Sequence, residues 1–367
     1  MSDTQVLDKL RKQIDSADAE LLRMLSWRAE LSLKVGRYKA GEGLAVFCPE
    51  REQELLAELK EKNTGPLSDE QLLAIYTEIL SASRALQKPQ LAACLGPVGT
   101  FSYLAGQEYL GKGTTMQPQP NLEAVFASVA DGKTQLGVVP LENSLQGSVG
   151  QSLDLFMHYQ VHVAAEFFYR VRHSLLSLEE KPGAVEKIYS HPQPLAQCAN
   201  WLKTSLPEVA LVTTGSTAHA AELAKKEPGS AAIGHVNLSG MFGLNVLAED
   251  IEDQSDNWTR FVLIAKGRAE EARPACEKTC NSLGKSTILF TLDNRPGALS
   301  AVLNVFQTHR LNLSKLESRP ARDANWGYTF FADVEANLLE MPEVLQSLAA
   351  CCHLVKVLGV YPLGRQL

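Results

Sequence analysis

The chain has 367 residues, enough for two or three domains with cores of their own. Its 45% apolar and 21% charged residues are the balance of an ordinary globular protein, and its longest apolar runs are far short of a membrane span. The formal net charge of −7, without any basic block, speaks against a nucleic-acid partner but leaves small anionic substrates open, because a few local cations can hold them.

Seven scattered cysteines indicate free thiols in a reducing cytoplasm. Cys276 and Cys280 are close together, but no histidine lies near them, so a zinc site is a poor interpretation. The N-terminal residues have neither a basic start nor an apolar core, so we expect no secretory signal. No P-loop is present, and no Gly-x-Gly-x-x-Gly follows a strand-like run. We therefore expect no cofactor, no metal and a cytoplasmic location.

The N-terminal segment is predicted to be helical. Apolar residues recur at steps of three and four over residues 4–40, which predicts one long helix that is broken at Gly41-Glu42-Gly43. Pro49 suits a first helical position and opens a second helix to about residue 62. Ser68 caps a third helix that ends near Gln87.

The first helix carries cations where apolar residues belong. Arg28 and Lys39 fall near the centre of its apolar stripe and Arg11 falls on the edge. Long stems could lie on the core while their charges reach water. Three such residues on one helix favour a bound anion instead, because unpaired buried cations are costly. The helix would span roughly 54 Å, more than the next two helices can cover, so a second copy of the chain is its simplest cover.

From Leu91 onward the pattern changes to that of an α/β domain. Short apolar runs such as 91–95, 136–139 and 161–165 alternate with helical stretches to about Lys266. Residues 267–285 are polar and predict a linker. Strand, helix, two strands, helix and strand are then predicted at 287–292, 296–309, 313–319, 328–334, 342–351 and 355–360. This βαββαβ order is typical of a ferredoxin-like unit.

Residues 257–261, Asn-Trp-Thr-Arg-Phe, run directly into the apolar strand 262–265. Thr259 and Arg260 thus place a hydroxyl beside a guanidinium at the mouth of a buried strand. Such a pair can hold a small carboxylate and give a proton to a leaving oxygen. The alternative is an ordinary strand start, in which Arg260 braces the strand.

Three further segments offer ligands for a carboxylate. The turn in Leu95–Ser102 places N–H groups and hydroxyls at a helix start, although such turns are more often structural. Asn143 and Ser144 follow a strand and Glu142, which fits a capping or structural role equally well. Residues 214–218 open a helix with exposed N–H groups. A fourth segment contains His191 as a candidate base, but a histidine before a proline is more often structural.

The tail has two motifs at the ends of predicted strands. Asn294–Leu299 includes Gly297, which lets a ligand approach the backbone near a helix start that attracts a carboxylate. Leu316–Pro320 ends the next strand. An ordinary turn in a dimerisation module is the alternative, and the presence of both motifs favours a bound effector.

These motifs resemble those of the bifunctional chorismate mutase/prephenate dehydratases. Residues 5–88 resemble the all-helical mutases, Thr-Arg-Phe and Pro-x-Glu-Asn match the dehydratases, and Gly-Ala-Leu and Glu-Ser-Arg-Pro match a phenylalanine-binding ACT domain. The resemblance implies a helical mutase domain at 1–88 and a bilobal, periplasmic-binding-protein-like α/β dehydratase domain at 91–267. It also implies a ferredoxin-like α+β ACT domain at 286–363.

For the mutase, the resemblance implies a pericyclic rearrangement of chorismate to prephenate by positioning and electrostatics alone. Arg28, Lys39 and Gln87 would be catalytic. The implied substrate-binding set is Arg11, Arg28, Lys39, Arg51, Glu52, Ser83 and Gln87, with Arg11 reaching into a partner's site. Cys48 departs from the pattern, because some relatives carry an aspartate there, and it is also a weak helix cap.

For the dehydratase, the resemblance implies conversion of prephenate to phenylpyruvate, with Thr259 as the proton donor or its relay. The implied substrate ligands are Thr100, Ser102, Asn143, Ser144, Ser216, Thr217, Thr259 and Arg260. L-Phenylalanine would be the inhibitory effector, and its implied ligands are Asn294, Gly297, Ala298, Leu299, Glu317, Ser318 and Arg319. We expect a homo-oligomer, dimer or tetramer, without a nucleic-acid or membrane partner.

Two rival functions stay open at this point. In one, the helical segment serves only assembly, an idea that Cys48 supports and the retained Arg28, Lys39, Glu52 and Gln87 weaken. In the other, the bilobal cleft senses a ligand without chemistry. Thr259 argues against a sensor, because a pure carboxylate binder has no evident need of that hydroxyl.

Overall fold

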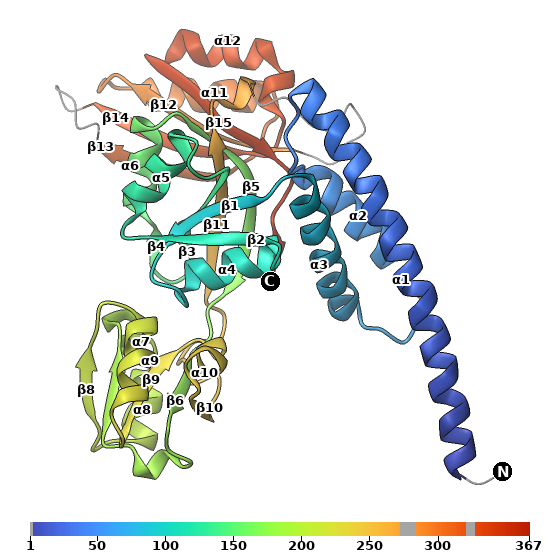
Figure 1. Ribbon diagram of the computed structural model, residues 1–367. Coiled ribbons are helices and arrows are strands. Elements are labelled where there is room, and N and C mark those ends of the chain that lie inside the picture. The colour runs from blue at the N-terminus through green and yellow to red at the C-terminus, as the bar shows by residue number, and fades with distance from the viewer. Residues whose placement is uncertain (1–2, 272–283, 321–326) are drawn as a thin grey trace. The chain divides into compact units, whose positions relative to one another are not determined.

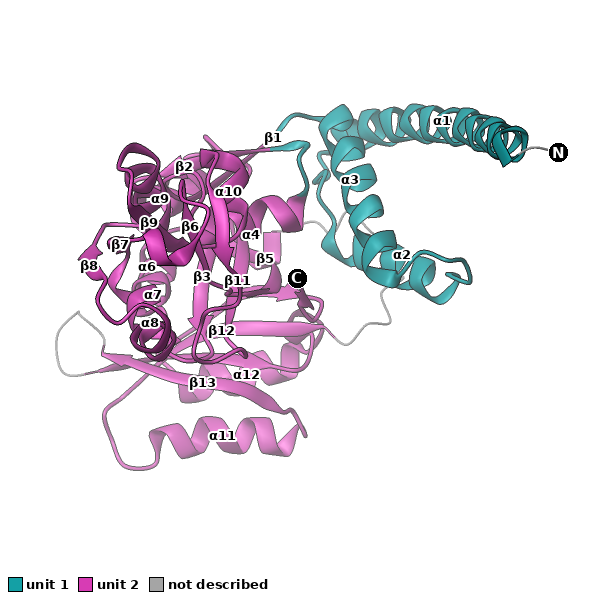
Figure 2. Cartoon of the chain, turned by 90° about the horizontal axis from the view of Figure 1, so that it is seen from below, with its two compact units in different colours: residues 1–90, 111–114, 273–279 teal, residues 91–110, 115–272, 280–367 magenta. Residues whose placement is uncertain are grey.

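The computed structural model describes residues 3–271, 284–320 and 327–367. Cys276, Cys280 and most of the predicted linker at 267–285 lie outside the described residues. The chain divides into two compact units, one formed mainly by the first 90 residues and the other by nearly all the rest (Figure 2). Among the described residues, no helix has the length and apolar character needed to cross a bilayer.

The first unit confirms the predicted helices, as α1 (Asp3–Glu42), α2 (Pro49–Glu61) and α3 (Asp69–Gln87). Ser68 caps α3 through a reciprocal bond with Gln71, as its position predicts. α1 continues through Gly41, where we expected its end. α1 also extends well beyond α3 (Figure 1), and apolar side chains along it are exposed, such as Ile14 at 59% and Trp27 at 58%.

Gly36 is a buried residue at which α1 packs closely against α3. A Cβ added there would lie 2.7 Å from Cγ and 2.9 Å from Cβ of Gln87. No real Cβ contact is that short, so only glycine lets the two helices pack in this way. Gln87, one of the predicted catalytic residues, is thereby fixed against α1.

In the second unit, a first lobe is built on the sheet β16-β5-β11-β3-β1-β2, with β4 paired to β3. These strands are β1 (Gln90–Leu95), β2 (Thr114–Gln119), β3 (Leu136–Asn143), β4 (Gly147–Ser148), β5 (Val161–Arg170), β11 (Trp258–Lys266) and β16 (Arg365–Gln366). Helices α4 (Phe101–Leu110), α5 (Leu122–Ala130) and α6 (Gly150–His158) pack on it. The two long central strands, β5 and β11, are antiparallel neighbours and are the segments by which the chain leaves and re-enters this lobe.

The second lobe is inserted between β5 and β11 and has the sheet order β10-β6-β9-β7-β8. Its strands are β6 (Ser174–Ser177), β7 (Lys187–Ser190), β8 (Ala210–Thr213), β9 (Ser230–Gly234) and β10 (Asn245–Ala248). Its helices are α7 (Pro192–Gln197), α8 (Ala199–Ser205), α9 (Thr217–Lys226) and α10 (Asn237–Phe242). Two hydrophobic clusters, one on each face of the sheet, form its core. The predicted bilobal α/β architecture is confirmed.

The C-terminal part folds as the predicted βαββαβ unit, with sheet order β13-β14-β12-β15. Its elements are β12 (Lys285–Leu292), α11 (Ala298–Thr308), β13 (Leu313–Pro320), β14 (Tyr328–Val334), α12 (Pro342–Cys351) and β15 (Leu354–Tyr361). α11 begins two residues later than expected, because Gly297 has a left-handed φ of 83° and cannot belong to the helix. One face of this sheet packs under its own helices, and the other joins the first-lobe core through Leu289, Phe331 and Leu358.

We predict that Gly36→Val destabilises the helical unit by about 1–3 kcal/mol, because the added side chain overfills the contact between α1 and α3. Gly41→Val is the matched control. It lies in the same helix, a Cβ added there would have nothing within 4 Å, and we expect it to be nearly neutral. Thermal melts followed by circular dichroism would show the difference. Equal melting of the two variants would contradict tight packing at Gly36.

Candidate active sites

The dehydratase candidates Thr259 and Asn143 lie directly opposite each other on β11 and β3. The Asn143 amide NH2 donates to the Thr259 hydroxyl over 3.0 Å and to the Asn257 side-chain oxygen over 2.8 Å. The orientation of the Asn143 amide is fixed, because its oxygen accepts from the backbone N–H groups of Leu145 and Gln146. The Thr259 oxygen is thus an acceptor toward Asn143, and its own hydrogen is left to donate elsewhere.

The next residue pair on the same ladder faces the opposite way. Arg260 lies opposite Glu142, and successive side chains of a strand alternate between the two faces. Arg260 is only 5% exposed and donates to Glu166 over 2.8 Å, to Asp333 over 2.5 Å and to the Tyr361 hydroxyl over 3.2 Å. The predicted role as a substrate ligand does not describe these contacts. The alternative, in which Arg260 braces the strand, does.

Arg260 belongs to a buried ion network between the first-lobe sheet and the C-terminal sheet. Lys285 lies 3.1 Å from Glu166 and 3.3 Å from Asp333, so two cations balance two carboxylates. Burial alone would lower the pKa of Arg260, but Tyr361, Asp333 and Glu166 together raise it above its ordinary value. Burial likewise works against ionised Asp333, and Arg260 and Lys285 outweigh it and lower the pKa of that carboxyl.

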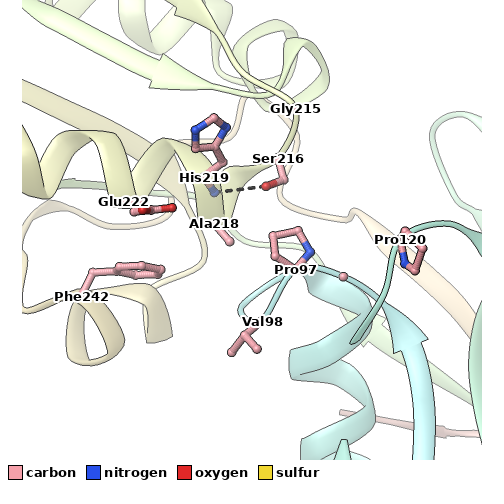
Figure 3. Close-up of a pocket in the computed structure, with 10 residues that line it drawn as sticks. Pro97, Val98, Pro120, Gly215, Ser216, Ala218, His219, Glu222 and Phe242 are labelled. Carbon is pink, nitrogen blue, oxygen red and sulfur yellow. Dashed lines mark hydrogen bonds between the residues drawn. The ribbon is translucent and has the colours of Figure 1, made fainter. Parts of the chain in front are cut away.

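A cavity of about 610 Å³ lies between the two lobes (Figure 3). The first lobe contributes Gly96, Pro97, Val98 and Pro120, and the second lobe contributes Gly215, Ser216, Ala218, His219, Glu222 and Phe242. Ser216 also caps α9, since its hydroxyl accepts from the His219 N–H. Of the predicted substrate ligands, Ser216 alone lines this cavity. His219 and Glu222 of α9 and Phe242 of α10 were not predicted, because the periodicity of a helix does not show which of its faces meets the cleft.

Several other predicted ligands are engaged in local structure. Thr100 donates to the Leu95 carbonyl and accepts from the Tyr103 N–H, so it shapes the turn before α4. Ser144 accepts from the Trp258 N–H and donates to the Asp256 carbonyl, which ties the β3 end to the start of β11. Ser102 and Thr217 are buried. His191 caps α7 by accepting from the Gln193 N–H, which fits its structural interpretation.

A buried polar pair near the connection between the lobes had no signal in the sequence. His173 bonds Gln197 through its Nε2 over 2.8 Å. The His173 Nδ1 and the Gln197 Nε2 are both buried and have no hydrogen-bond partner among the described residues. Such groups are costly unless a ligand or water satisfies them.

In the helical unit, several of the predicted mutase residues make contacts between elements. Arg28 donates to the Ser83 hydroxyl and Lys39 to the Val46 carbonyl over 2.9 Å. Glu52 pairs with Arg84, a buried cation that no sequence pattern indicated. The Gln87 side-chain oxygen is buried without a hydrogen-bond partner among the described residues.

Two mutase candidates lie at the surface instead. Arg11 is paired with Asp8 at 3.7 Å with its side chain 67% exposed, and Arg51 is paired with Glu54 at 3.4 Å. At 1.5 Å per residue, Arg11 is roughly 26 Å along α1 from Arg28, too far to reach the same site within one chain. Cys48 makes no side-chain cap to α2, as its weak capping tendency predicts.

The predicted effector residues divide into two groups. A Cβ added at Gly297 would have no atom within 4 Å, and Ser318 is exposed. Glu317 accepts from Ser148 of the first lobe, and Arg319 lies 3.3 Å from Asp154 of α6. Glu317 and Arg319 thus contact the first lobe, and their role as effector ligands stays a prediction.

Comparison with known proteins agrees with this division into parts. Residues 10–88 match the chorismate mutase type II family, residues 92–269 the prephenate dehydratase family and residues 286–353 the ACT domain. A bifunctional chorismate mutase/prephenate dehydratase from Aquifex aeolicus is 38% identical over 97% of this chain and 98% of its own length.

Two solved structures match the second unit equally well. A prephenate dehydratase from Arthrobacter aurescens, in complex with L-Phe, is 29% identical, with a TM-score of 0.66 over 74% of this chain and 90% of its own. A quorum-quenching acylase is 28% identical, also at a TM-score of 0.66, over 74% of this chain and 98% of its own. Because these two proteins carry out different chemistry by their names, the fold alone does not decide the reaction.

The helical site, the two-lobed cleft and the C-terminal regulatory fold together define a multidomain enzyme that handles small carboxylic acids. The full-length sequence match goes further than the fold. The chain belongs to the family of bifunctional chorismate mutase/prephenate dehydratases.

Proposed function

We propose that the chain performs its two family reactions at two separate sites built from the residues described above. Membership of the family makes it a chorismate mutase and a prephenate dehydratase. The observation that carries the dehydratase assignment is the Asn143–Thr259 hydrogen bond, which presents the Thr259 hydroxyl as a donor. A cytoplasmic location stays a prediction.

In the mutase site, the reaction is intramolecular and needs neither a nucleophile nor an acid–base group. Arg28 and Lys39 hold the carboxylates of chorismate in the reactive conformer. Lys39 and Gln87 meet the negative charge that develops on the ether oxygen. Gln87 would donate to that oxygen through its amide NH2. Its amide oxygen is an acceptor that is buried without a partner among the described residues, and a hydroxyl of the bound ligand would satisfy it.

A second copy of the chain completes the mutase site in our proposal. The exposed apolar side chains on α1 need a cover, and Arg11 is too distant from Arg28 to act in the same site of one chain. An antiparallel neighbour would bury that stripe and bring its own Arg11 to the anion. The rival in which the helices serve only assembly is disfavoured, since Arg28 bonds Ser83 across α1 and α3 and Gln87 packs against Gly36 of α1.

In the dehydratase site, prephenate loses carbon dioxide and its ring hydroxyl. The electron pair of the breaking carbon–carboxylate bond enters the ring, the carbon–oxygen bond breaks, and hydroxide leaves. Thr259 donates a proton to the departing oxygen, so that water forms, and regains it from solvent. Aromatisation drives the step. A second function as a ligand sensor without chemistry is disfavoured, because it gives the oriented Thr259 hydroxyl no task.

We further propose that L-phenylalanine binds the C-terminal domain and inhibits the dehydratase. The complex of the Arthrobacter aurescens relative with L-Phe supports this proposal. Gly297 leaves the backbone open to a ligand at the start of α11, and Asn294, Ala298, Leu299 and Ser318 remain its candidate neighbours.

Thr259→Ala should lower kcat for prephenate by roughly 10²- to 10⁴-fold while changing KM little, since the hydroxyl acts as the leaving group departs. Thr259→Ser should keep part of the activity. Thr204→Ala, in an exposed helix, is the matched control and should behave as the wild type. Steady-state kinetics on supplied prephenate makes the test, and normal turnover in the Thr259→Ala variant would rule out this donor.

Arg28→Ala and Lys39→Ala should each lower chorismate turnover by roughly 10²-fold or more, because a positioned charge on the transition state is lost. Dehydration of supplied prephenate should stay near the wild-type rate in the same preparations. Lys34→Ala, on the exposed side of the same helix, controls for the loss of a charge. Unchanged chorismate turnover would mean that Arg28 and Lys39 extend their charges into solvent and do not bind the substrate.

Gly297→Val should abolish inhibition by phenylalanine while dehydration continues, because a side chain there blocks the ligand's approach. A non-glycine residue at this φ costs about 1–2 kcal/mol, so the control must carry the same strain. Gly229→Val supplies it, since Gly229 has a φ of +73° in a second-lobe turn, and a Cβ added there would have no atom nearer than 4.0 Å. Undiminished inhibition of the Gly297→Val variant would place the effector elsewhere.

A further inference from the structure

The two catalytic side chains and two ion-pairing side chains are neighbours on one strand ladder. Asn143 lies opposite Thr259, and the adjacent Glu142 lies opposite Arg260. Because strand side chains alternate, a displacement of Glu142 or Arg260 on one face moves the backbone that carries Asn143 and Thr259 on the other. The contacts of Glu142 and Arg260 therefore bear on the geometry of the proton donor.

The C-terminal domain contributes a partner to each of these two residues. Lys315 of β13 donates to Glu142 and to the Ser148 hydroxyl, each over 2.8 Å, and its side chain is only 13% exposed. Ser148 itself lies opposite Glu142 in the β3–β4 pair. Lys315 thus bonds to both β3 and β4, and its β3 partner is the residue before Asn143. Asp333 likewise bonds to Arg260, the residue after Thr259.

Lys315 directly precedes the predicted effector motif Leu316–Pro320 on β13, and side chains alternate between the two faces of that strand. Lys315, Glu317 and Arg319 are half-buried against the first lobe, while Leu316 and Ser318 between them are exposed. A ligand on the exposed face of β13 therefore acts on the strand whose opposite face holds Glu142.

We propose that Lys315 is a positioning residue for prephenate dehydration: through Glu142 it holds the Asn143–Thr259 hydrogen bond in register. This inference rests on the proposed dehydratase function. Lys315 does not touch the substrate, so its loss should reduce turnover more than binding. Phenylalanine should also lose part of its effect in such a variant, because one of the contacts that transmits it is gone.

The test is a double-mutant cycle of Lys315→Met and Glu142→Gln in the full chain, assayed on supplied prephenate and on chorismate. We expect each single variant to lower kcat for prephenate about tenfold with KM changed less than twofold and chorismate turnover unchanged. The double variant should be no worse than either single one, since the two residues act through one contact. Lys315→Arg should restore most of kcat.

Lys133→Met is the matched control, because it breaks an ion pair of the same length, 2.8 Å to Asp131, between exposed side chains. Wild-type kcat in Lys315→Met, additive losses in the double variant, or parallel loss of both activities would each overturn the proposal. Should Lys315→Met fail to fold, Glu142→Gln and Lys315→Arg still decide it through the ratio of kcat to KM. A wild-type chain that does not dehydrate prephenate would refute the proposed function instead.

Discussion

The ion network around Arg260 is the constraint on which the second unit depends. Arg260, Glu166, Asp333 and Lys285 are all buried where the first-lobe sheet meets the C-terminal sheet. Each charge has an opposite partner within 3.3 Å or less, and removal of any one would leave an uncompensated charge in the interior. Only one relative placement of the two sheets matches these charges. The surrounding apolar side chains stabilise the contact between the sheets, but they do not determine that placement.

Because side chains alternate along β3 and β11, adjacent residues of each strand face two different surfaces. The Thr-Arg pair is divided by the strand, so that Thr259 contacts Asn143 on one side and Arg260 joins the domain contact on the other. The Pro-x-Glu-Asn segment is divided in the same way, with Asn143 on one side and Glu142 on the other. The residues proposed for dehydration and the residues of the domain contact therefore alternate along the same two strands.

The sequence predicts most of the fold, because helical periodicity, caps and the βαββαβ order are local signals. Arg28 and Lys39 stand out on one helix, so the sequence alone is enough to propose them as mutase residues, and that role stays a prediction. The contacts of Arg260, Glu317 and Arg319 could not be predicted, because the face that each side chain takes depends on strand register and on a distant partner. Arg84 and the His173–Gln197 pair were not predicted for a related reason, because a buried polar group can be recognised only once its neighbours in space are known.

The short strand β16 has a consequence for the order in which the chain can fold. Arg365 and Gln366 pair with Phe167 and Phe168 at the edge of the first-lobe sheet, about two hundred positions away in the sequence. On the ribosome, that sheet can acquire its central strands as soon as residue 266 emerges, but its outer edge at β5 stays open until residue 366 follows. During that interval the nascent chain exposes unpaired backbone next to aromatic side chains, a surface that invites association with other chains. We therefore expect this edge of the sheet to be open to association with other chains while the last hundred residues are synthesised.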